Sequence, residues 1–461
     1  MRIRFNSTSR ILRCAALAVV LSTAGALAQT EPDLRQIMLR LDRLEEQNRA
    51  LLAEIRQLRS ELAASSLHPA EETTGSQPGL DERLQVEETR TADLAQSKVE
   101  AAHHFPIRLT GMALFNAFLN SHGSAGGQYP TFAAPDSDPS GGASFRQSII
   151  GLDFDGPHAL GDGKISGTLR LDLFGGSGQG LDQLVRLRTA TLGIDWKSRG
   201  FLVGVDKPII SPREPDSIAQ VGVSPLSGAG NLWLWIPQAR FHQNFQLGEL
   251  TGFQFQAGVV QTRENSGSPL SPYTDPKGAA DFESARPGVE ARLEFFSGSN
   301  RRIEIAGGFH HSVSHVAYIS VPSDVYSVDW LARPWKLIEF TGSFFTGQNV
   351  APLGTGGIRQ GLVILGPNQA QAVHSLGGWG QLTIRPLPRF WCNLFTGQQD
   401  DRNSNLPAGS IGKNLAFGAN VFYRIAPNVL ASFEAAQTRA DYISSGMLRN
   451  NHYDLGLAYL F

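Results

Sequence analysis

From about residue 107 to the last residue, apolar and polar side chains alternate along the chain with a period of two. In the stretch 163–175, GKISGTLRLDLFG, one set of alternate positions is apolar and the other is polar or charged. The stretch 289–296, VEARLEFF, has the same pattern. Such alternation is the signature of a β-strand with two chemically different faces. The pattern predicts sixteen strands, which begin near residues 107, 145, 164, 185, 199, 238, 250, 287, 301, 325, 336, 372, 389, 412, 428 and 449.

The connections expected between these strands alternate in length. Short links are expected at 197–200, 247–250, 297–300, 332–335, 386–388 and 426–428. Long polar loops are expected near 120–143, 207–236, 262–285, 312–324, 348–371 and 398–411. A soluble β-sandwich has no reason to sort its loops by length to one end, whereas an outer-membrane barrel has short periplasmic turns and longer outside loops. The sequence therefore predicts an all-β fold, a 16-stranded antiparallel transmembrane β-barrel over residues 105–461.

The two faces of the strands suit a barrel in lipid. Apolar side chains such as Leu293 are expected to point outward and charged ones such as Arg292 toward a wet lumen, because an outward Arg at mid-bilayer costs about 2–4 kcal/mol. Every backbone polar group must be bonded within the membrane, so the sheet has to close. The final stretch 453–461, YDLGLAYLF, is therefore expected to pair with the first strand. Aromatic side chains beside the short turns are expected to form an outer girdle: Trp196, Trp335, Trp391 and Tyr423.

Residues 1–28 have the composition of a secretory signal peptide. Four arginines flank the start of the chain, an apolar stretch AALAVVLSTAGAL follows, and the small residues ALA at 26–28 suit a cleavage site. The mature chain is then expected to begin near Gln29, outside the cytoplasm, with Cys392 as its single cysteine. A single cysteine excludes an intramolecular disulfide.

A heptad pattern over residues 29–64 predicts a periplasmic α-helical coiled coil. Met38 and Leu52, at e positions, widen the apolar stripe and favour three helices over two. The alternative is a single amphipathic helix packed on its own domain, but an unbroken seam favours self-association in register. Residues 65–104 are expected to form a linker. The expected core positions are Leu34, Ile37, Leu41, Leu44, Asn48, Leu51, Ile55, Leu58 and Leu62.

Charge and short motifs argue against several other functions. Residues 105–461 carry 27 basic and 27 acidic residues, which argues against a nucleic-acid partner. HHSVSH (310–315) is interpreted as a strand end that runs into an outside loop without clustered carboxylates, and GGSGQG (175–180) lacks the helix that a phosphate-binding loop needs. The sequence has no nucleophile elbow and no HExxH motif. We therefore expect no enzyme, no metal and no cofactor, with a barrel hydrolase as an alternative.

The order of signal peptide, short coiled coil, linker and barrel ending in Phe461 resembles the DcaP-like trimeric outer-membrane porins, which are related to the phosphate-selective porins. The likeness is most specific in RQSIIGLDFDGP (146–157), VRLRTATLGIDW (185–196) and FLVGVDKPIISP (201–212). It implies a homotrimer, contact with outer-membrane lipid and lipopolysaccharide, and passive uptake of small hydrophilic, often anionic, solutes. It also implies that Tyr459 and Phe461 belong to a C-terminal signal for the barrel insertion machinery. The balanced charge of the barrel departs from a strongly anion-selective porin.

Candidate pore residues come from strand phase and from the resemblance. Strand phase places in the lumen Arg170, Asp172, Arg240, His242, Glu290, Arg292 and Glu294. In porins of this build the third outside loop folds into the lumen, so the resemblance adds Asp206, Lys207, Arg213, Glu214 and Asp216. The phase of Arg186 and Arg188 conflicts with that of Leu192 unless a bulge intervenes, which leaves the lumen, the outer rim and a subunit contact open. Opposite charges on the same faces predict a transverse field with weak anion preference at most. The alternative for every one of these charges is plain solvation in a water-filled pore.

A second functional hypothesis is a structural anchor. In that case the coiled coil contacts the cell wall or a periplasmic partner, and the barrel only holds the protein in the membrane. Conductance in a planar bilayer separates the hypotheses, because a barrel that is only an anchor, or a plugged hydrolase, conducts no ions.

Overall fold

A computed structural model describes residues 106–135, 137–176, 183–262, 268–273, 287–316, 318–355, 358 and 360–461. The expected signal peptide, coiled coil and linker lie outside the described residues and stay predictions. In the described part of the chain, no helix has the length and apolarity needed to cross a membrane.

β-Strands dominate the described residues, as the period-two pattern predicts. One antiparallel sheet contains β1 (Ile107–Asn120), β2 (Ser140–Ser144), β3 (Ile149–Ala159), β4 (Gly163–Gly175), β5 (Leu184–Asp195), β6 (Arg199–Asp206), β7 (Ile236–Gln246), β8 (Thr251–Val260), β9 (Gly288–Ser297), β10 (Ile303–Val316), β11 (Ile319–Trp335), β12 (Ile338–Gln348), β15 (His374–Leu387), β16 (Phe390–Asp401), β17 (Ile411–Ala426), β18 (Val429–Tyr442) and β19 (Gly446–Leu460). The connections hold a small hairpin and two 3-10 helices: β13 (Leu362–Gly366), β14 (Gln369–Ala372), η1 (Ala351–Leu353) and η2 (Asn403–Asn405).

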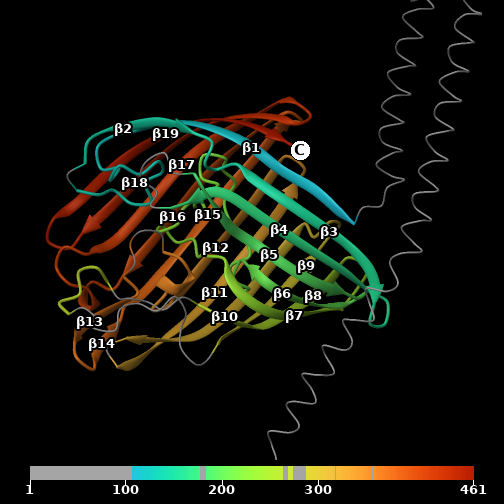
Figure 1. The fold of residues 1–461 in the computed structure, drawn as a ribbon, viewed down its shortest axis with the longest axis horizontal. Coiled ribbons are helices and arrows are strands. Elements are labelled where there is room, and N and C mark those ends of the chain that lie inside the picture. The colour runs from blue at the N-terminus through green and yellow to red at the C-terminus, as the bar shows by residue number, and fades with distance from the viewer. Residues whose placement is uncertain are drawn as a thin grey trace, which may run out of the picture. The chain divides into compact units, whose positions relative to one another are not determined.

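The sheet closes between its first and last strands. β1 pairs with β19 on one side, and on the other its two halves pair with β2 and β3 in turn. β2 and β3 therefore occupy one position, and the 17-stranded sheet has sixteen positions around the barrel. The backbones of Gly111 and Phe461 exchange hydrogen bonds of 2.8 and 3.1 Å, and β1 and β19 lie side by side in Figure 1. The predicted closed antiparallel barrel of sixteen strands is confirmed.

Two faces of opposite chemistry run along the strands. On β9, Leu293 is 51% exposed, whereas its neighbours Arg292 and Glu294 are 3% and 4% exposed. On β19, Leu455 and Leu457 are exposed and Asp454 is buried. The apolar residues lie on the outside and the polar ones inside, the reverse of a soluble protein and the arrangement that lipid requires.

Some expectations about the loop ends and the girdle are wrong. The stretch 312–324 is not a long loop, because β10 and β11 pair as far as Val316 and Ile319. His and Ser side chains mimic a loop there, but the alternate ones are buried inside the barrel, as Ser312, Ser314 and Ser323 show. Trp391 does not belong to the outer girdle, since its ring stacks at 5.0 Å on the buried Phe422.

Candidate functional site

The connection between β6 and β7, residues 207–235, lies inside the barrel and is called the inserted segment below. Asn116 on β1 donates a hydrogen bond of 2.9 Å to the Ile218 carbonyl oxygen, and Ser327 on β11 donates one of 2.9 Å to that of Ile210. Asn420 on β17 donates one of 2.8 Å to the carbonyl oxygen of Asp216. Because these strands lie at separate places around the barrel, a segment that contacts them all must run through its interior, as the resemblance implies.

The inserted segment packs mainly against β9–β12, β15–β19 and β1, whose interior face is called the covered wall. Apolar side chains fix it there in two places. Ile210 and Leu232 are buried with Val325, Phe345 and Val350, and Leu226 and Ala229 are buried with Trp379, Phe395 and Ala416. Most of the polar side chains of this wall are consequently shut off from water.

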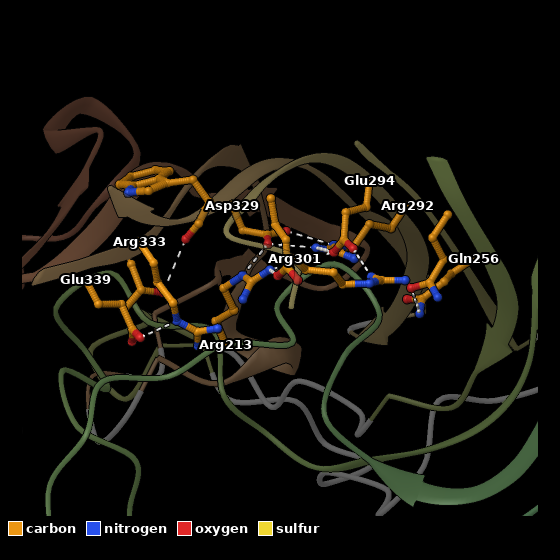
Figure 2. A network of polar contacts seen from close by, with 12 residues as sticks. Arg213, Gln256, Arg292, Glu294, Arg301, Asp329, Arg333 and Glu339 are labelled. Atoms are coloured by element: carbon orange, nitrogen blue, oxygen red, sulfur yellow. Dashed lines mark hydrogen bonds and ion pairs between the residues drawn. The ribbon is translucent and has the colours of Figure 1, made fainter. Parts of the chain in front are cut away.

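A buried ionic network joins the segment to the covered wall (Figure 2). Arg292 donates to Asp329 with two bonds of 2.8 Å and to Glu294 with one of 2.6 Å. Arg213, from the inserted segment, donates to Asp329 at 2.9 Å and also to Glu304. Charges removed from water this far need such partners, because an unpaired buried charge costs several kcal/mol. Arg213, Arg292 and Glu294, which were predicted to line the pore, thus act first as anchors of the segment.

Glu290 and Asp216 also lie in the contact between segment and wall. The Glu290 carboxylate accepts a hydrogen bond of 2.5 Å from the Ile209 backbone N–H and pairs with His310 at 2.9 Å. The Asp216 backbone N–H donates to Gln381 at 2.8 Å. Burial, and next the negative charge of Glu339, raise the pKa of the Asp216 carboxyl.

The sequence analysis did not single out Glu434, yet it holds three elements together. Its carboxylate accepts hydrogen bonds from Ser217 at 2.6 Å and Gln220 at 3.2 Å in the inserted segment, and from Asn420 at 2.9 Å. Tyr129, in the connection between β1 and β2, donates a fourth at 3.2 Å. A single acid among the small or apolar inward side chains of β18 is the signal that would have found it.

The interior face of β3–β8, called the open wall, carries charged side chains that water reaches. Arg170 pairs with Asp153 at 2.5 Å, and Arg240 pairs with Asp206 at 3.0 Å. The side chains of the two arginines are 30% and 21% exposed. His242 lies 3.6 Å from Asp195 on the same wall. Strand phase predicts the inward direction of Arg170, Arg240 and His242, and here the structure leaves them accessible.

The edge of the inserted segment that faces the open wall carries a further pair. The Lys207 ammonium lies 2.7 Å from the Glu214 carboxylate, and about 30% of each side chain is exposed. Burial would raise the pKa of Glu214, but the Lys207 charge and hydrogen bonds from Lys207 and Ser224 lower it overall. Opposite charges therefore face the lumen from both sides.

A bulge settles the position of Arg186 and Arg188. Pairing between β4 and β5 shifts after Arg170, so that Leu171 lies opposite Leu187 and Arg188 is the extra residue. Arg186 and Arg188 both bind the fully buried Asp172, at 2.6 and 3.0 Å, and donate to the backbone carbonyls of Gly222 and Val221. Both arginines thus face the interior, where they tie the inserted segment to the loop end of the open wall.

A cavity of about 630 Å³ opens at the end of the barrel that carries the short turns. Its floor includes Asp216 and Ser217 of the inserted segment, and its rim carries Lys336, Arg385 and Arg424. Arg385 pairs with Glu339 at 3.3 Å, whereas Lys336 and Arg424 form no ion pair within the described residues. This mouth therefore carries two basic side chains without an acidic partner in the described part of the chain.

The histidines of HHSVSH do not converge on one site. His310 points inward to Glu290 and Ser312, and His311 lies on the outward face, 2.7 Å from Asp324. Within the described ranges, no group of three His, Cys, Asp or Glu side chains is arranged to hold a metal ion. The stretch belongs to β10 and does not run into a loop, which corrects the sequence interpretation.

Comparison with protein-family models gave no match, and neither did comparison with curated proteins. Among solved structures, the outer membrane channel DcaP of Acinetobacter baumannii is similar, with a TM-score of 0.63 and 15% identity over 77% of this chain and 97% of that one. An anion-selective porin from Comamonas acidovorans has a TM-score of 0.53 and 11% identity over 77% of this chain and 99% of that one. The predicted relation to the DcaP-like porins is confirmed for the fold.

Proposed function

We propose that this protein is an outer-membrane porin through which small hydrophilic solutes diffuse passively. The supporting observation is the asymmetry of the barrel interior. The inserted segment is bound to the covered wall, and the space along the open wall retains exposed charged side chains such as Arg170, Arg240 and Lys207. A polar, water-accessible path inside a closed barrel is the architecture of a porin.

The proposed channel discriminates weakly by charge. Each exposed cation of the open wall has an anion beside it, so the field along the path alternates in sign over short distances. The unpaired Lys336 and Arg424 at the turn-end mouth add a mild preference for anions. Carboxylate-bearing and dipolar solutes fit such a path, while a strongly anion-selective filter does not.

Planar-bilayer conductance tests the proposal with a matched pair of variants. Thr168→Trp places an indole in the path beside the open wall, and Leu169→Trp places one on the opposite, outward face of the same strand. We expect ohmic channels in the wild type, a reduced single-channel conductance for T168W and an unchanged one for L169W. A correctly folded wild type that does not conduct would favour the anchor or the plugged hydrolase.

We further infer a homotrimer in the outer membrane whose coiled coil, residues 29–64, lies in the periplasm after removal of residues 1–28. Heptads join chains, whereas barrel closure uses residues after 105. Deletion of residues 33–62 is therefore expected to weaken trimers without unfolding the barrel, and crosslinking of a peptide of those residues should give trimers. A peptide that stays monomeric at high concentration removes the basis for this assembly. Tyr459 and Phe461 are proposed as the signal for the insertion machinery.

A further inference from the structure

A second cavity, of about 600 Å³, lies on the outside of the barrel near the ends of the strands that carry the long loops. Strands β11, β12, β15 and β16 form it. Its lining includes Asp324, Tyr326, Gln348, His374, Leu376, Asp400 and Arg402.

Strand register shows that this cavity faces away from the lumen. Asp324, Gln348 and His374 lie opposite one another in one row across three strands. The next outward row, toward the middle of the barrel, contains Tyr326 and Leu376, which are 59% and 46% exposed. Val325, which lies between Asp324 and Tyr326 along β11, is fully buried on the inner side. The cavity therefore has an apolar floor that continues into the lipid-facing wall and a charged rim above it.

The charges on the rim are not all neutralised. Asp324 accepts from Gln348 at 2.9 Å and pairs with His311, and Asp400 pairs with Lys413 at 3.4 Å. His374 contacts the Asn405 side chain at 3.3 Å but has no acidic partner in the part of the chain that the structure describes. Arg402 likewise has none there. The two carboxylates thus have their own partners, and two nitrogen donors remain for an external acceptor.

The loop ends of β3 and β5 present a different surface. At the loop ends of β3 and β5 the outward side chains include Ile150, Val185 and Leu187, all exposed and apolar. Plain lipid contact needs only such a surface. A polar rim directly above an exposed Tyr and Leu instead matches an amphiphile that has an anionic head and an apolar tail, because a guanidinium group binds phosphate oxygens with charge-assisted hydrogen bonds and an imidazole N–H also donates to them.

We propose that this outward cavity binds the phosphate-bearing headgroup of an outer-leaflet lipid, held by Arg402 and His374, with an acyl chain over Leu376 and Tyr326. The inference rests on the proposed outer-membrane location but not on conduction. It makes this side of the barrel a specific lipid site, separate from the solute path inside.

Native mass spectrometry of the delipidated protein tests the site. Phosphatidylglycerol and a diacylglycerol with the same chains serve as probes, so that the two differ by the phosphate headgroup. We expect the wild type to retain phosphatidylglycerol more tightly than the diacylglycerol. The double variant Arg402→Gln, His374→Gln should lose about tenfold or more of that affinity, because the charge-assisted contact of Arg402 and the imidazole contact of His374 are removed. The variant Arg402→Lys, His374→Lys places an ammonium donor at both positions and should retain most of the affinity.

Controls separate the site from general effects. Arg389→Gln removes an exposed arginine in the short turn between β15 and β16, at the opposite end of the barrel, and should leave lipid retention unchanged. The β-sheet circular dichroism spectrum of each variant shows that the barrel is folded. Equal retention of the two lipids, equal affinity of the Gln double variant, or displacement of the lipid by inorganic phosphate at the same concentration would each overturn the proposal. A folded wild type that does not conduct would count against the proposed porin function and not against this lipid site.

Discussion

The covered and open walls are made from the same strand pattern but serve different purposes. Arg292 on the covered wall and Arg240 on the open wall both point inward from an alternating strand, yet Arg292 is 3% exposed and the Arg240 side chain 21%. The first is enclosed by acids and the inserted segment, and the second has one acid and water. A charged side chain inside this barrel is enclosed in a buried ion-pair network where the inserted segment covers it, and it stays accessible to water where the segment does not.

The largest difference between the walls is expected in stability. Arg292→Ala leaves Glu294 and Asp329 buried without their main partner, which should destabilise the barrel by about 3–5 kcal/mol. Arg170→Ala breaks an accessible pair and should cost about 0–1 kcal/mol. Urea unfolding of both variants in the same detergent checks the contrast. Similar losses for the two would show that the inserted segment does not shield the covered wall.

A smaller effect is expected where one carboxylate holds two loops. Glu434→Gln keeps the size of the side chain but replaces one oxygen acceptor by an NH₂ group, which then faces either the donors of Gln220 and Tyr129 or those of Ser217 and Asn420. We expect a loss of about 1.5–3 kcal/mol, because hydrogen bonds to a charged group are at stake. The inserted segment should loosen, which increases the current noise of open channels and exposes the segment to protease. Quiet channels with unchanged cleavage would contradict an anchoring role.

The open wall is expected to govern selectivity. Arg240→Ala leaves the Asp206 carboxylate unpaired and should shift the reversal potential in asymmetric salt toward cations, while Asp206→Asn should shift it toward anions. The double variant should return close to the wild type. The shifts should grow at low salt, since the screening length rises from about 10 Å at 0.1 M to about 30 Å at 0.01 M. Unchanged potentials in both single variants at low salt would place the narrow part of the path elsewhere.

Arg213→Ala sharpens the same comparison. Its partners Asp329 and Glu304 are shared with the buried network, so this change should cost stability first and shift selectivity less than Arg240→Ala. The sequence places both arginines in the pore, Arg240 by strand phase and Arg213 by the resemblance, and the structure separates them.

Much of the fold follows from local pattern. The alternation of side chains gave the start of most strands to within about three residues, because burial on one face and lipid or water on the other act on every second residue. The conflict in phase at Arg186 and Arg188 indicated that a bulge was one solution, and the structure contains it. Both strands of the β10–β11 hairpin were predicted, but the stretch 312–324 was predicted as a loop, because its inward His and Ser residues look like a loop when the polar interior is not yet known.

The division of the interior into two walls could not be predicted from local sequence pattern. Arg213 and Asp329 are 116 positions apart, and Ser217 and Glu434 are 217 apart. Which wall the inserted segment joins depends on such distant partners, together with the apolar contacts of Ile210 and Leu226. Strand phase therefore gave the direction of Arg292, Glu290 and Glu294 correctly and gave no information about what covers them.

The smallest expected effect is the pH dependence of stability caused by Asp216, which lies in the part of the inserted segment near the short turns. Burial and the charge of Glu339 raise the pKa of Asp216 in the folded protein above its ordinary value of 3.8. Between that value and the raised one, the folded state binds more protons than the unfolded state, so this group makes the protein more stable as pH falls through the window and less stable as pH rises.

Asp216→Asn should remove this contribution while keeping the backbone bond to Gln381. The measurement is the urea midpoint of the wild type and D216N from neutral pH down to about pH 4, which is close to the pKa of a carboxyl group in an unfolded chain. The paired acids of the open wall contribute to both proteins alike, so the difference between the two curves isolates Asp216. We expect the urea midpoint of the wild type to rise relative to that of D216N as pH falls. Parallel curves would mean that water reaches Asp216 through the turn-end cavity and that the segment is not closed against the covered wall there.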